Sequence, residues 1–217
     1  GGPGAIIWMI IADFFGMTSK FTEVTLGQMY RVTRPDGRLM GGAMEYLSRG
    51  LAEKGMPTLG KYLAITFAIF CIFGSLGAGN AFQVSQALGA VKGEVPFFND
   101  YPWVFGLIMM SLVAVVIIGG IKRIAHAAEA IVPTMVIIYV SACLWIILSN
   151  AAIVPDALAT IWHGAFSLDA GFGALVGVIV QGFKRAVFSS EAGIGSAAIA
   201  HSAASVKYPI RQGMVAL

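Results

Sequence analysis

Apolar residues in this sequence gather into long continuous runs rather than alternating with polar ones. The runs cover five segments: 5–26, 62–85, 103–121, 130–149 and 170–205. A membrane-spanning helix needs about 20 apolar residues in a row, whereas a strand of a membrane barrel is an alternating segment of about 10. The pattern therefore predicts an all-α integral membrane protein, with residues 1–217 forming a single transmembrane domain.

The last apolar segment is too long for one straight crossing. Between Asp169 and Lys207 lie 37 residues. A straight helix of that length would measure about 55 Å, against about 30 Å for the hydrocarbon core. Its middle carries Glu191 beside closely spaced serines and glycines, and irregular backbone at membrane depth is tolerated only where protein or a cavity surrounds it. We expect the helix to be broken near 188–193.

The composition agrees with a membrane protein. Of the residues, 58% are hydrophobic and 12% are charged, whereas about 25% are charged in a soluble domain. The 27 glycines suit close packing of helices in lipid. Cys71 and Cys143 both lie in apolar runs without metal-ligand spacing, so we interpret them as packing residues. The net charge of +3 comes mostly from loops, which indicates membrane topology rather than a nucleic-acid surface.

Basic residues are unequally divided between the two predicted sides of the membrane. Eleven of the 14 lie in three loops that should share one side: 18–61, 122–129 and 206–212. The loops expected on the other side, 86–102 and 150–169, carry only Lys92. Because short loops rich in Lys and Arg stay cytoplasmic, the first span should run inward from an external GGPG. We expect a multi-pass protein of the cell (inner) membrane.

Two local elements are expected in the long polar stretch 18–61. RPDGR at 34–38 is typical of a turn, and 41–55 has the pattern of a short amphipathic helix at the membrane surface. The chain opens without an initiator Met and stops where a new apolar run begins. We therefore expect an incomplete domain, an internal piece of a longer transporter-like protein.

Several motifs, in order along almost the whole chain, resemble those of the alanine or glycine:cation symporter family. They are GGPGAIIWMII (1–11), GAGNAFQVS (77–85), VIIGGIKRIAHAAEAIVP (116–133), KRAVFSSEAGIGSAAIAHSAA (184–204) and YPIRQG (208–213). The chain departs from the family pattern at single positions within these motifs: Ile7, Ile10, Ser85, Ala186 and Ser190. The combination of motifs is more specific than any one of them.

The resemblance implies the five-plus-five inverted-repeat fold of the leucine-transporter and amino acid–polyamine-cation superfamilies. In that fold the first and sixth helices are broken, and they hold the substrate and sodium. The chain would contain helices two to six and the start of helix seven. The sodium ligands would then lie mainly outside it.

The expected break and the resemblance together suggest a substrate site. Backbone groups freed between Phe188 and Gly193 can bind an ammonium and a carboxylate, and half-helix ends supply partial charges. By the resemblance, Gln83 is a further substrate contact. The predicted substrate-binding residues are Gln83, Phe188, Ser189, Ser190 and Gly193.

Asn80, Arg185 and Glu191 are predicted to be structural or gating residues. A buried charge needs a partner, so Arg185 and Glu191 would pair with each other across the break or with other helices. Asn80 would form hydrogen bonds between helices, and an ordinary bond of this kind is also the alternative for Gln83. The alternative for the 182–201 stretch is a cytoplasmic turn after a helix that ends at Arg185.

Three further polar residues were considered for chemistry. Asp13 lies in the first apolar run, where a carboxylate is costly, so it would pair with a basic residue or bind a cation. Ser196 and His201 could suggest a nucleophile and its base, but five residues separate them by about 140° around one helix, and such a pair needs hydrogen-bond reach. We therefore predict no catalytic residues and no enzyme.

The sequence predicts a transporter that moves a small neutral amino acid, alanine or glycine, together with sodium by alternating access. The partners expected are the amino acid, sodium and the lipid bilayer, with no nucleic acid. No cofactor is expected besides sodium as a co-transported ion. The alternatives are a proton-coupled or differently selective amino-acid transporter of the same superfamily, and a non-transporting truncated membrane protein.

Overall fold

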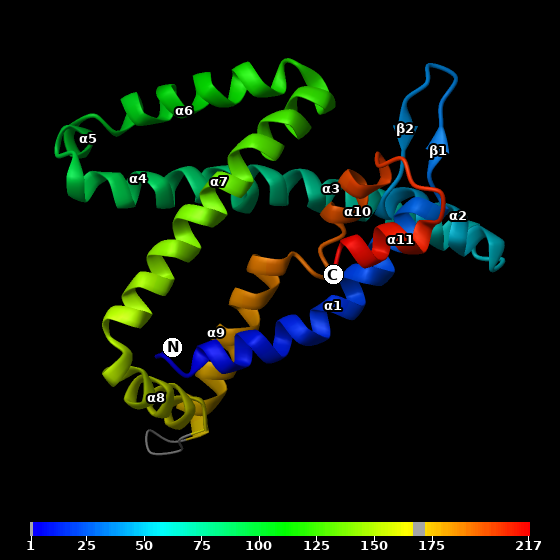
Figure 1. The fold of residues 1–217 in the computed structure, drawn as a ribbon. Coiled ribbons are helices and arrows are strands. Elements are labelled where there is room, and N and C mark those ends of the chain that lie inside the picture. Colours follow the sequence, from blue (N-terminus) through cyan, green and yellow to red (C-terminus); the bar gives the residue numbers. More distant parts are fainter. Residues whose placement is uncertain (1, 167–171) are drawn as a thin grey trace. The chain divides into compact units, whose positions relative to one another are not determined.

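The computed structural model describes residues 2–166 and 172–217, and in this part of the chain almost every element is a helix (Figure 1). The chain divides into two compact units. One combines Gly1–Cys71 with Pro155–Leu217, and the other is Ile72–Val154. The expectation of an α-helical membrane protein is confirmed. The described chain also contains one pair of strands, each two residues long.

The first unit is built around helix α1, which packs against α9, α10, α11 and α2 (Figure 1). Its elements are α1 (Ala5–Met29), β1 (Val32–Thr33), β2 (Leu39–Met40), α2 (Ala43–Glu53), the start of α3 (Pro57–Gly74), α8 (Val154–Phe166), α9 (Phe172–Ser190), α10 (Ser196–Ser202) and α11 (Pro209–Val215). Segments from the two ends of the chain therefore share one core around α1.

Small residues let α1 approach its neighbours closely. A Cβ atom added to Gly27 would lie 2.9 Å from the carbonyl oxygen of Ala198 in α10. One added to Gly182 of α9 would lie 2.5 Å from Cβ of Trp8. The indole Nε1–H of Trp8 also donates a hydrogen bond of 3.0 Å to the carbonyl of Ala165, which ties α1 to α8. Close backbone approach at small residues is how helices associate in lipid.

The polar stretch after α1 holds both local elements that the sequence predicts. Strands β1 and β2 pair in antiparallel fashion, with Val32 opposite Met40, and Gly37 takes a φ of +78° in the turn between them. Helix α2 then covers Ala43–Glu53. The predicted turn and the predicted short helix are confirmed, and α1 itself ends three residues later than the first apolar run.

The second unit contains the other apolar helices. Its elements are the end of α3, the π-helical turn η1 (Ser75–Ala81), α4 (Phe82–Glu94), α5 (Phe97–Asp100), α6 (Pro102–Ile117), α7 (Gly120–Ser149) and the 3₁₀ turn η2 (Ala151–Ile153). The expectation of a loop at 122–129 is wrong, since these residues form the first turns of α7. The break between α6 and α7 lies instead at the glycine pair 119–120, where Gly120 has a φ of +71°.

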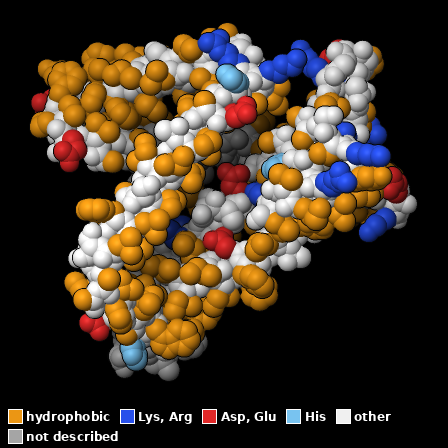
Figure 2. Space-filling model, in the orientation of Figure 1, with side chains coloured by type: hydrophobic (Ala, Val, Ile, Leu, Met, Phe, Trp, Pro, Cys, Tyr) orange, Lys and Arg blue, Asp and Glu red, His pale blue; other side chains and the backbone are white. Residues whose placement is uncertain are grey.

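In the described part of the chain, three helical segments are long and apolar enough to cross a membrane: Ala5–Met29, Pro57–Glu94 and Gly120–Ser149. Helix α6 is apolar but shorter. Large hydrophobic side chains project outward along α7, as Figure 2 shows, and Trp145 there is 75% exposed. Such exposure suits a lipid-facing helix, so the chain is a multi-pass membrane protein.

Candidate functional site

The long apolar segment near the C-terminus is interrupted. Helix α9 ends at Ser190 and α10 begins at Ser196, so residues 191–195 form a non-helical link. The amide of Glu191 still donates a helical hydrogen bond of 3.0 Å to the carbonyl of Val187. Phe188 through Ser190 therefore form the last turn of α9, and the expectation that unwinding begins at Phe188 is wrong. The alternative of a helix that ends at Arg185 is wrong as well.

The backbone of the link explains where the helix stops. Glu191, Gly193 and Gly195 have positive φ angles of 53°, 84° and 82°. A left-handed conformation costs a non-glycine residue about 1–2 kcal/mol, so glycine suits the second and third positions. At Glu191 the side chain compensates locally, because its Oε2 accepts a hydrogen bond of 2.7 Å from the hydroxyl of Ser196.

The bond between Glu191 and Ser196 bears on two predictions. Glu191 joins the end of α9 to the start of α10, and the described structure shows no ion pair between it and Arg185, whose side chain is exposed on α9. Ser196 and His201 also face different partners, since Nδ1 of His201 lies 2.6 Å from Nε2 of Gln212 in α11. The geometry does not bring this serine and histidine together as a nucleophile and its base.

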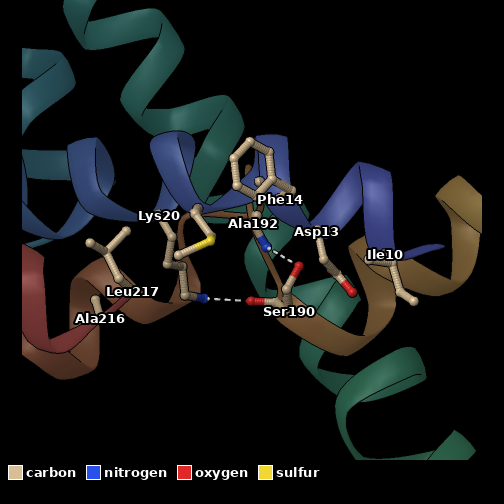
Figure 3. A pocket seen from close by; sticks show the side chains of 10 residues that line it. Ile10, Asp13, Phe14, Lys20, Ser190, Ala192, Ala216 and Leu217 are labelled. Atoms are coloured by element: carbon tan, nitrogen blue, oxygen red, sulfur yellow. Dashed lines mark hydrogen bonds between the residues drawn. The ribbon is translucent and has the colours of Figure 1, made fainter. Parts of the chain in front are cut away.

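Helix α1 supplies a polar partner for each side of the link. The ammonium of Lys20 donates a hydrogen bond of 2.8 Å to the carbonyl of Ser190, the last residue of α9 (Figure 3). The carboxylate of Glu23 interacts with the backbone amides of Gly193 and Gly195. Its Oε2 is buried, and the described residues give that oxygen no hydrogen-bond partner. The link is thus held from α1 by one cation and one anion.

The far end of α10 is held in the same way. The side-chain amide of Gln28, which is 4% exposed, donates hydrogen bonds to the carbonyls of His201 and Ala204. The guanidinium of Arg31 donates bonds of 3.1 Å and 2.6 Å to the carbonyls of Ser202 and Ala204. The last carbonyls of a helix lie outside its regular hydrogen-bond ladder. Here Gln28 of α1 and Arg31, two residues beyond α1, provide donors.

A cavity of about 520 Å³ opens beside the end of α9, lined by residues of α1, α9, the link and the segment after α11. Figure 3 shows the side chains of Asp13 and Lys20 on either side of Ser190. Oδ1 of Asp13 is buried, and the described residues provide no hydrogen-bond partner for it. Asp13 has no basic partner in the described part of the chain, so a pairing with a residue elsewhere stays a prediction.

The remaining predicted residues belong to the second unit. Asn80 lies in the π-helical turn, and its side-chain amide donates a hydrogen bond of 2.9 Å to the carbonyl of Ser75 in that turn. The bond is within one helix rather than between helices as expected. Gln83 is exposed in the first turn of α4. Its contact with a substrate stays a prediction.

Lys20, Glu23, Gln28 and Arg31 were missed as site residues, because the sequence places them at the inner end of the first span or in the polar stretch after it. The signal that could have found them is their spacing. Lys20 and Glu23 are three residues apart, and so are Gln28 and Arg31. Residues three or four apart share one face of a helix, so Lys20 and Glu23 mark a polar face of α1, whereas Arg31 lies beyond the helix end at Met29.

An apolar multi-helix chain with an interrupted helix is typical of secondary transporters. A model of the sodium:alanine symporter family matches residues 1–217. The chain is 43% identical to the sodium/alanine symporter AgcS of Methanococcus maripaludis, with 100% of the chain and 47% of that protein covered. It is 36% identical to the "Probable sodium/glutamine symporter GlnT" of Bacillus subtilis, with 99% and 43% covered.

A third relative, the amino-acid carrier protein AlsT of Bacillus subtilis, is 35% identical, with 99% of the chain and 44% of that protein covered. The chain belongs to the sodium:alanine symporter family. The resemblance inferred from the motifs is therefore confirmed, and the family and its named members are transporters rather than enzymes. The chain spans about half the length of the curated relatives it matches.

Proposed function

We propose that the complete protein carries a small neutral amino acid, alanine or glycine, into the cell together with sodium. The family name and the name of the relative with 43% identity both combine sodium with alanine. The name of another relative combines sodium with glutamine. We propose the small substrate because the relative named for alanine is the more similar of the two, at 43% identity against 36%. Because the chain spans about half of each relative, the proposal concerns the protein that contains it.

The observation that carries the proposal is the interruption between Ser190 and Ser196. An interrupted helix exposes backbone donors and acceptors that an intact helix would consume, and an amino acid presents complementary ammonium and carboxylate groups. Sodium coordination also favours oxygen ligands such as freed carbonyls. The proposed substrate contacts are Phe188, Ser189 and Ser190 in the last turn of α9 and Gly193 in the link. Gln83 of α4 is a further proposed substrate contact, by the family resemblance.

Gly193 contributes space in this proposal. Its amide interacts with Glu23, but no described atom lies within 4 Å of the position that a Cβ would take. A ligand can therefore approach the backbone at this residue. Ser189 and Gly193 are both exposed in the described chain, as residues facing an open substrate path should be.

The wider mechanism is alternating access in the five-plus-five inverted-repeat fold, with this chain providing helices two to six and the start of seven. In the multi-pass inner-membrane arrangement, residues 2–4 are external and the basic loops are cytoplasmic. Arg185, Glu191 and Asn80 act as structural or gating residues. Sodium is a transported ion rather than a resident cofactor, and most of its ligands come from other parts of the protein.

The test is uptake of labelled alanine by the full-length protein in liposomes with an inward sodium gradient, repeated with potassium or choline. We expect uptake to stop without sodium, and unlabelled glycine to compete better than glutamine. Uptake that follows a proton gradient without sodium would overturn the coupling ion, and stronger competition by glutamine would overturn the small substrate. Absence of any amino-acid uptake would overturn the function.

Gln83 has a matched control on the same helix, because Gln86 is also exposed in α4. Gln83→Ala should raise the KM for alanine by about tenfold or more, since one lost hydrogen bond to a charged group is worth about 1.5–3 kcal/mol. Gln86→Ala should leave the KM unchanged. Equal effects of the two substitutions would remove Gln83 from the site.

A further inference from the structure

The second half of α1 presents a row of polar side chains. Lys20 lies in α1, whereas Arg31 lies two residues beyond the end of that helix at Met29. Glu23 and Gln28 lie between them, and all four contact α9, the link or α10. These four polar side chains, three on α1 and one just after it, are therefore turned toward the broken helix.

The order of these contacts follows the order of the broken helix. Lys20 contacts the carbonyl of Ser190, and Glu23 contacts the amides of Gly193 and Gly195. Farther along the chain, Gln28 in α1 and Arg31 just after it contact the carbonyls at 201, 202 and 204. Helix α1 and the residues directly after it therefore contact both halves of the broken helix.

The charges of Lys20 and Glu23 are opposite to the partial charges of the backbone groups that they meet. An interruption leaves backbone carbonyls without partners at the end of the first half and amides without partners in the link, and such groups are costly inside a bilayer. The cation Lys20 meets a carbonyl, and the anion Glu23 meets amides. Exchange of the two residues would place the cation beside amides and the anion beside a carbonyl. The positions and charge signs of Lys20 and Glu23 therefore favour the interrupted conformation of the helix.

Backbone proximity is an independent sign that α1 and the link fit each other. A Cβ atom added to Gly16 would lie 3.0 Å from Cβ of Ala192 in the link. One added to Gly27 would lie 2.9 Å from the carbonyl of Ala198 in α10. Glycines on both sides of the Lys20–Glu23 pair therefore bring α1 close enough for these two side chains to reach the link backbone.

We infer that Lys20 and Glu23 are positioning residues of the transport site, which fix the backbone of the 191–195 link from α1. The inference rests on the proposed function, since it assigns the link to substrate binding. Neither residue needs to touch the substrate. Their effect on transport passes through the conformation of the link that the substrate contacts.

The transport test uses the full-length protein in liposomes and compares Lys20→Met, Lys20→Arg and Glu23→Gln with the wild type. Lys54→Met is the control for loss of a lysine, because Lys54 is exposed after α2. Lys20→Met and Glu23→Gln should each raise the KM for alanine about ten- to hundredfold, as expected for one lost charge-assisted bond. Lys20→Arg keeps a cationic donor and should stay within a few-fold of the wild type.

A second measurement does not depend on transport. Hydrogen exchange of peptides covering 188–196 should become at least tenfold faster in Lys20→Met and Glu23→Gln in detergent, while peptides from α7 keep the wild-type rate. A wild type without amino-acid uptake would overturn the proposed function, and the exchange result would then decide the inference alone. Unchanged exchange and KM in both variants, or equal losses in Lys20→Arg and Lys20→Met, would overturn the inference.

Discussion

The two glycines of the link differ in their surroundings, and this difference gives a sharp prediction. Gly193 and Gly195 have nearly equal φ angles of 84° and 82°. A Cβ at Gly195 would lie 2.7 Å from Cε2 of Phe67 and 3.3 Å from Cβ of Ala43. In the described chain, a Cβ at Gly193 would meet no atom within 4 Å. Alanine at 193 would therefore have backbone strain only. Alanine at 195 would have the same backbone strain and would also be overpacked against Phe67.

The magnitudes follow from these two contributions. Left-handed backbone costs alanine about 1–2 kcal/mol at either site. Overpacking against a ring typically adds about 1–3 kcal/mol. Gly193→Ala should therefore destabilise the protein by about 1–2 kcal/mol, and Gly195→Ala by about 2–5 kcal/mol.

The assay is thermal unfolding of the full-length protein in detergent, followed by tryptophan fluorescence and by recovery of monodisperse protein on gel filtration. The melting temperature should fall in the order wild type, Gly193→Ala, Gly195→Ala. Phe67→Ala removes the ring that the new methyl group meets. In the double variant with Gly195→Ala, part of the loss should be recovered, which appears as a coupling of about 1–3 kcal/mol in a double-mutant cycle.

Two outcomes would refute this reasoning. Equal melting temperatures for Gly193→Ala and Gly195→Ala would show that the ring of Phe67 does not confine the link. A double-mutant cycle with no coupling between residues 67 and 195 would show the same by an independent route.

Trp8→Phe should lower the free energy of unfolding by about 1–3 kcal/mol, because the carbonyl of Ala165 loses its buried donor; thermal unfolding measures this. Gly27→Ala should lower it by about 1–3 kcal/mol in the same assay, because the methyl group would overpack the contact between α1 and α10. The Glu53 carboxylate accepts the Tyr30 hydroxyl and raises the pKa of that phenol. Glu53→Gln should lower this pKa again, so tyrosinate absorbance should appear at lower pH than in wild type.

Each of these predictions has a control or a contrary result. Trp162 is 61% exposed, so Trp162→Phe should have little effect on stability. No described atom lies within 4 Å of a Cβ at Gly89 in α4, so Gly89→Ala should be neutral or stabilising. The absorbance change of Tyr30 is obtained by subtracting the titration curve of the Tyr30→Phe variant from that of the wild type. The bond favours the neutral phenol. Its contribution to the stability of the folded protein is therefore present below the ordinary tyrosine pKa and is lost as pH rises through the raised pKa.

Much of the architecture was readable from local sequence. Runs of apolar residues located the long helices because bilayer thickness sets the length of a crossing. RPDGR located the hairpin turn, and the excess length of 170–205 required an interruption. The family was readable from the motifs, since their order along the chain is preserved.

Helix ends were less readable. The sequence predicts a loop at 122–129, yet charged residues there continue α7. It places the start of the interruption at Phe188, yet the helical bond from Glu191 to Val187 keeps that turn intact. Local polarity marks where a helix leaves the apolar region, but hydrogen bonding and backbone angles decide where it stops.

The sequence by itself determined which segments are apolar, that one of them is interrupted, and which family the chain belongs to. These properties depend on residues close together along the chain. Only the tertiary structure decided that Lys20 meets the end of α9, that Glu23 meets the link, and that Gln28 and Arg31 meet the end of α10. A backbone group left unpaired by an interruption can be satisfied by any helix that lies beside it, and which helix does so is fixed by packing between segments more than 150 residues apart.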